Sequence, residues 1–123
     1  MALANFAAVQ AFFNNFINAN NIDIAGAPHG AFWMTSYNNF VGGNVPNVAD
    51  PNTGNPIPIL SKGDGQHSNI VYAMAGTPGT LWDSNNPEGF GQMPVGGPFF
   101  SAAQIQELSD WITAGCPNDT GTA

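Results

Sequence analysis

The sequence predicts a single mainly α-helical domain over residues 1–123, with four or so short helices joined by long loops. Apolar residues recur at three- and four-residue steps near both ends of the chain, which is typical of amphipathic helices. The 15 Gly and 10 Pro fall largely between these segments and indicate turns. With 43% hydrophobic residues, the chain has enough apolar surface for a core. We expect the first and last helices to pack together.

The first helix is predicted near the N-terminus. Its apolar positions are Leu3, Phe6, Val9, Phe13, Phe16 and Ile17. Polar side chains, Gln10 and Asn14 among them, fall mostly on the opposite side. The helix should therefore bury one face. Residues 20–30 are rich in Asn, Gly and Pro, so a loop is expected to lead into Phe32 and Trp33.

The middle of the chain is predicted to hold two short helices separated by an irregular segment. Thr35 or Ser36 is a suitable N-cap for a helix that ends at Gly42. Residues 42–66 contain five Gly and four Pro, which exclude a long helix, although residues 57–60 suit an extended segment against the core. A second helix is expected over residues 68–75, and a loop over residues 77–98.

The last helix has clear signals at both ends. Ser101 and Gln104 have the spacing of a capping box, and Gly115 stands where a left-handed residue commonly ends a helix. Its apolar stripe consists of Ile105, Leu108, Trp111 and Ile112.

Charge and targeting signals limit the classes of partner. Lys62 is the only Lys or Arg against eight acidic residues, giving a formal net charge of −7. Binding to nucleic acid or to anionic lipid is not expected, because both need several basic side chains. Residues 1–19 lack a basic leader and are interrupted by Asn, so we expect a soluble chain without a signal peptide or membrane segment. The compartment and self-association both stay open.

Catalytic signatures are weak. Cys116 is the only cysteine, which excludes an internal disulfide, a thiolate zinc cluster and covalent haem. His67 lies near Asp64 and Ser68 in the sequence, but no nucleophile elbow surrounds any Ser. We therefore predict a protein that is not an enzyme.

The order of helices and loops resembles that of a class I cytochrome c domain. The local match consists of a Gln-Met-Pro segment at residues 92–94, followed by the capped helix that begins near Ser101. In that family a Met-Pro loop supplies the sixth haem ligand, and the terminal helix packs across the first. The resemblance implies that His29 is the proximal ligand and Met93 the axial ligand of a haem iron.

The attachment motif of that family is absent. Two cysteines should precede the histidine in a Cys-x-x-Cys-His pattern, and Ala25 and Pro28 stand there instead. The predicted function is then non-catalytic ligand binding, by a pocket that either holds a non-covalent haem for electron transfer or is empty and used for another ligand. Trp33, Tyr37, Phe40 and Met74 would line this pocket. If it is empty, these residues should interlock as core and the surface would carry the function.

A second class of function is equally compatible with the sequence. Asn-rich runs, such as residues 38–39, 44–55 and 85–86, place amide groups near Trp33, Tyr37 and Trp82. Planar amides and aromatic faces are the groups that hold neutral sugars. The alternative prediction is therefore a carbohydrate-binding module, whose ligand is a neutral small molecule or glycan.

Overall fold

Helices lie near both ends of the chain, and a small β-sheet lies between them. The computed structural model describes residues 3, 5–22, 32–87, 89–93 and 98–118. Their elements, in order, are α1 (Phe6–Ala19), α2 (Tyr37–Gly42), β1 (Asn44–Ala49), β2 (Pro56–Pro58), the 3₁₀ turn η1 (Gly65–His67), α3 (Asn69–Ala75) and α4 (Ala102–Thr113). Within these residues, no helix combines the length and apolar character needed to cross a membrane.

The sheet corrects the predicted fold class. The described chain is mixed α and β, and the prediction of a mainly α fold was wrong. β1 and β2 pair antiparallel, with Asn44 opposite Pro58 and Ala49 opposite Pro56. The unequal spacing between these two pairs is an irregularity of the β-bulge kind. Prolines and this irregularity interrupt the alternation of a regular strand, so the sequence indicated an irregular segment here, with residues 57–60 extended against the core. Ile57, Ile59 and Leu60 are buried, as that part of the prediction required.

Capping groups determine where the helices begin. The Asn5 side chain accepts a hydrogen bond from the backbone N–H of Ala8 at 2.9 Å, at the start of α1. Ser101 and Gln104 form the predicted capping box of α4, with hydrogen bonds of 3.1 and 2.8 Å. Such caps satisfy N–H groups that have no partner within the helix. The predictions that both segments are helical and that α4 begins with a capping box are confirmed.

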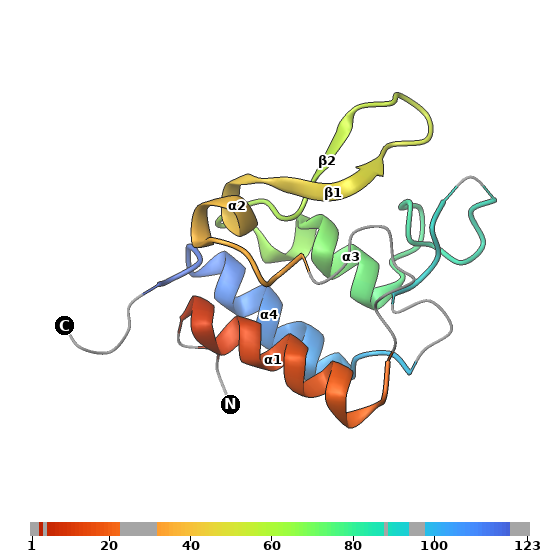
Figure 1. The fold of residues 1–123 in the computed structure, drawn as a ribbon. Coiled ribbons are helices and arrows are strands. Elements are labelled where there is room, and N and C mark those ends of the chain that lie inside the picture. Colours follow the sequence, from red (N-terminus) through yellow and green to blue (C-terminus); the bar gives the residue numbers. More distant parts are fainter. Residues whose placement is uncertain (1–2, 4, 23–31, 88, 94–97, 119–123) are drawn as a thin grey trace.

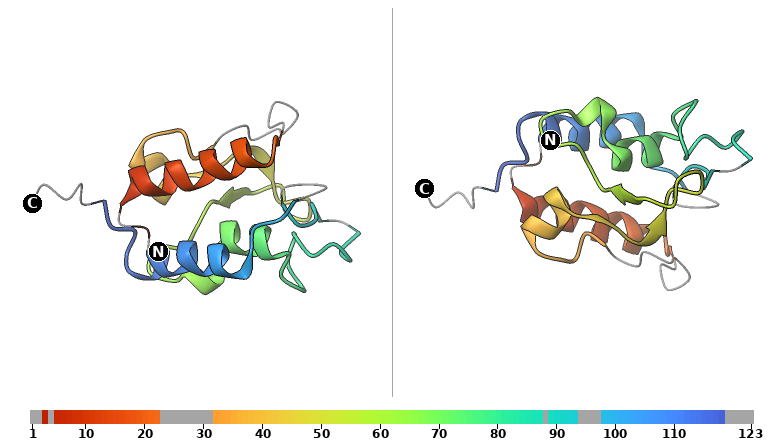
Figure 2. Two further views of the ribbon diagram at one scale, coloured as in Figure 1. Left: turned by 90° about the horizontal axis from the view of Figure 1, so that it is seen from below. Right: turned by 90° about the horizontal axis from the view of Figure 1, so that it is seen from above.

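Aromatic rings connect α1 to α4. Phe100, directly before the cap of α4, stacks on Phe16 of α1 with ring centroids 3.8 Å apart. Phe40 of α2 contacts both Phe6 of α1, at 5.3 Å, and Trp111 of α4, at 6.3 Å. Figure 1 shows the order of the elements, and Figure 2 shows α1 and α2 on one side of the molecule and α3 and α4 on the other. The first and last helices therefore share one core that includes rings from other segments.

Close backbone approach fixes η1 against α4. The N–H of Gly65 donates to the Thr113 hydroxyl at 2.9 Å, and a Cβ at Gly65 would collide with the Ser109 carbonyl. Only glycine fits at such a contact. η1 and the following α3 are thereby held beside the last helix.

Candidate functional site

The aromatic residues predicted to line a ligand pocket are mostly core residues. Trp33, Phe40 and Met74 are 4%, 0% and 2% exposed and belong to the same hydrophobic cluster. Tyr37 packs against that cluster, and its hydroxyl donates to the Cys116 carbonyl at 2.6 Å. Trp82 is buried apart from them against Phe90. None of these side chains presents a broad open face to a ligand.

Trp33 is fixed from two directions. Its indole stacks on Phe13 of α1, with ring centroids 5.0 Å apart and an interplanar angle of 24°. Its Nε1–H donates to Oδ1 of Asn14 at 2.8 Å. The sequence left Trp33 open as a stacking platform for a ligand, and its packing does not suit that role.

The predicted haem ligands are only partly described. His29 lies outside the described residues. Met93 is half-buried, and its backbone N–H donates to the Ala73 carbonyl at 2.8 Å, which holds its loop against the end of α3. Trp33, Phe40 and Met74 pack with other side chains in the hydrophobic cluster. Haem ligation by His29 and Met93 stays a prediction, which a visible spectrum with added haemin would test.

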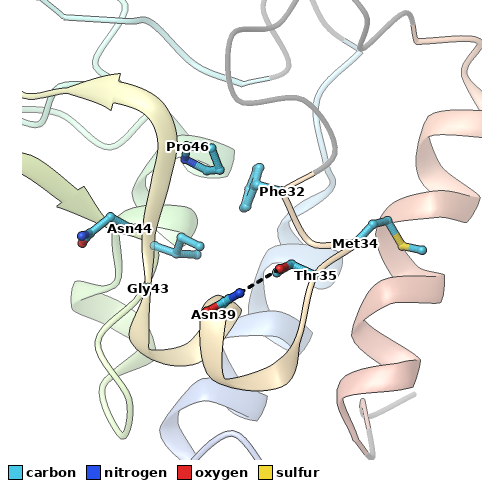
Figure 3. A pocket seen from close by; sticks show the side chains of 8 residues that line it. Phe32, Met34, Thr35, Asn39, Gly43, Asn44 and Pro46 are labelled. Atoms are coloured by element: carbon cyan, nitrogen blue, oxygen red, sulfur yellow. Dashed lines mark hydrogen bonds between the residues drawn. The ribbon is translucent and has the colours of Figure 1, made fainter.

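An open hollow lies elsewhere, beside α2 and the hairpin. Its volume is about 510 Å³. The lining residues come from the segment before α2, from α2 itself and from the hairpin region: Phe32, Met34, Thr35, Asn39, Gly43, Asn44, Pro46 and Ile59. Figure 3 shows Phe32 and Pro46 facing each other, and the Asn39 amide directed toward the Thr35 hydroxyl. The hollow thus combines apolar walls with an amide and a hydroxyl.

Two amides of α1 hold the wall formed by residues 33–35. Nε2 of Gln10 donates to the carbonyls of Trp33, at 3.1 Å, and Thr35, at 3.4 Å. Asn14, one turn further on, binds the side chains of Trp33 and Met34. The sequence placed Gln10 and Asn14 opposite the apolar stripe of α1 but gave no sign of this positioning role. Their i, i+4 spacing, which puts both amides on one helix face, is the signal that was available.

Helix α2 is fixed at both ends beside the hollow. Ser36 Oγ accepts from the Asn39 backbone N–H at 3.1 Å, as an N-cap should. At the other end, a Cβ on Gly43 would collide with the Asn39 carbonyl, so glycine allows β1 to leave the helix at once. The sequence predicted this cap and this termination, and both are confirmed.

Among the described residues that line the hollow, none has an ionisable side chain. An ionised ligand would find no opposite charge among its walls, and burial without such a partner is costly. Charged groups lie on other parts of the chain. Asp83, for example, has a pKa below its usual value because its carboxylate accepts backbone hydrogen bonds from Gly79 and Asn85.

The acid, histidine and serine near η1 do not form a catalytic triad. His67 Nδ1 lies 2.8 Å from Oδ2 of Asp64, and both side chains are exposed. The Ser68 hydroxyl is buried and donates to the Asp64 carbonyl at 2.8 Å, so it is not presented as a nucleophile. Among the residues that the structure describes, no group of three His, Cys, Asp or Glu has the arrangement of a metal site.

Comparison of the chain with protein-family models, curated proteins and solved structures finds no match.

Proposed function

We propose that this protein binds an uncharged, hydroxyl-bearing ligand, a neutral carbohydrate, in the hollow beside α2, without catalysing a reaction. The observation that carries the proposal is the composition of the walls. Phe32 and Pro46 supply apolar surface within reach of the Asn39 amide and the Thr35 hydroxyl, and none of the wall residues that the structure describes is ionisable.

This arrangement matches the chemistry of a sugar. One face of a pyranose carries C–H groups that pack on an aromatic ring, while its hydroxyls donate to and accept from amides. Within the described part of the chain, the Asn39 amide makes one hydrogen bond, a long one of 3.4 Å to Thr35, which leaves its carbonyl oxygen for a ligand. Phe32 supplies apolar surface to the hollow, whereas Trp33 and Trp82, for which the sequence suggested ligand contact, are buried.

Rigid walls favour such binding. Phe32 packs on Trp33 with ring centroids 5.3 Å apart and lies parallel to Phe40 at 6.2 Å, which fixes its orientation. The neighbouring backbone is held by Gln10. Ligand binding therefore orders few additional side chains, which lowers its entropic cost.

The test begins with a screen of the full chain against neutral and acidic glycans, followed by calorimetry on the best ligand. The Asn39→Ala variant should bind about fivefold more weakly, as expected for a lost hydrogen bond of about 1 kcal/mol. Asn38→Ala is the matched control, because Asn38 is exposed on the same helix but does not line the hollow.

Two results would contradict the proposal. One is retention of acidic glycans only. The other is an equal affinity for the Asn38→Ala and Asn39→Ala variants, which would place the ligand away from the hollow.

A further inference from the structure

The methionines differ sharply in exposure. Met34, on the wall of the hollow, is 55% exposed, whereas Met74 in the core is 2% exposed. Methionine is a soft, apolar side chain that usually fills internal gaps. An exposed methionine beside a candidate binding site is accessible both to a ligand and to an oxidant.

The Met34 sulfur has a specific partner. Nδ2 of Asn14 lies 3.3 Å from Sδ of Met34. The orientation of this amide follows from its other contact, because the Trp33 indole N–H is only a donor and must face the Asn14 oxygen. The Asn14 NH₂ group is therefore directed toward the sulfur, which is a weak acceptor.

We propose that Met34 is a modification site, oxidised to its sulfoxide by hydroperoxides, with Asn14 positioned to bind the product. The sulfur lone pair attacks one peroxide oxygen. An S–O bond forms and the O–O bond breaks, and the departing oxygen takes up a proton to leave as water when the oxidant is hydrogen peroxide. Sulfur is oxidised by two electrons and the peroxide is reduced. The sulfoxide oxygen is a far stronger acceptor than the thioether, so the Asn14 amide gains a better partner.

Oxidation makes the Met34 side chain polar. In Figure 3 this side chain extends away from Phe32 and Pro46, and its sulfur contacts Asn14 of α1. The modification therefore changes the contact between Met34 and α1 and not the interior of the hollow.

The modification is tested by peptide mass spectrometry on the full chain after mild treatment with hydrogen peroxide. Met34 should form sulfoxide well before Met74, which serves as the internal control. Oxidation of the two residues at equal rates would overturn the proposal. This readout needs no ligand, so it stands even if the hollow binds no glycan.

The role of Asn14 is tested by an Asn14→Asp variant. A carboxylate still accepts from Trp33 but cannot donate to Met34. Oxidation should leave the Tm of the natural chain unchanged or raised, and should lower the Tm of the variant through repulsion between two acceptors. Equal changes of Tm on oxidation of the two proteins would show that Asn14 does not bind the sulfoxide.

Discussion

Phe32 and Trp33 are neighbours in the sequence, yet they belong to different regions of the molecule. Trp33 is buried in the aromatic core, stacked on Phe13 and bound by Asn14. Phe32 is half-buried and lines the hollow. The two residues are similar in chemistry, so the difference lies in the side of the turn on which each side chain falls. Residue type alone does not separate a core position from a ligand contact.

The strongest test of this difference compares Trp33→Ala with Phe32→Ala. The Trp33 variant should lose about 3–5 kcal/mol of unfolding free energy, because a large buried side chain is removed. The Phe32 variant should lose only about 1–2 kcal/mol, since less apolar surface returns to water. Denaturant unfolding measures both. Equal losses would show that Phe32 is a core residue and not a wall of the hollow.

A second test compares a glycine at a crowded backbone contact with a glycine that has free space around it. Gly65→Ala should lower the unfolding free energy by about 1–3 kcal/mol, as over-packing does, because the added methyl group meets Ser109. Gly42 at the end of α2 has no atom within 4 Å of an added Cβ, so Gly42→Ala is the matched control. Its stability should stay within about 0.5 kcal/mol of the natural chain. An equally large loss of unfolding free energy in Gly42→Ala would show that the contact with Ser109 is not what makes Gly65→Ala destabilising.

A third test uses Cys116, which is fully buried in the core. Burial raises the pKa of its thiol to about 11, despite an opposing effect of the Lys62 charge. Because this pKa exceeds the unfolded value of 9.0, the stabilising contribution is complete below pH 9 and is lost as pH rises through 11. Unfolding free energy should fall by about 1 kcal/mol by pH 10, relative to a Cys116→Ala variant. Parallel pH profiles for the two proteins would mean that the thiol is accessible to water.

The sequence predicts the helices better than the sheet. The signals for α1 and α4 are local. Apolar residues repeat every three or four positions and capping residues lie within one turn of the helix end, so the sequence pattern is sufficient to predict both helices. The β1–β2 pair is missed because Pro46, Pro56 and Pro58 indicate turns and because its register is irregular. β2 is stabilised by its pairing with β1 and by the burial of Ile57, and neither interaction produces a pattern in the neighbouring sequence.

The hollow could be predicted only in part. Asn39 and Asn44 fall within Asn-rich runs that the sequence associates with sugar binding. In Figure 3, however, the Asn44 side chain points away from Phe32. Ile59 joins the hollow from a point twenty residues after Asn39, and no local motif connects positions so far apart. Such a site arises from tertiary packing.

The prolines of β2 also affect how the sheet meets other chains. An exposed strand edge can template pairing with a second molecule when it offers free N–H and C=O groups. Pro56 and Pro58 have no N–H, and the Pro58 carbonyl already accepts from the Asn69 side chain at 2.8 Å. A further strand adding to β2 would find few backbone partners. The β2 edge of the hairpin is thereby protected against growth into an aggregated sheet.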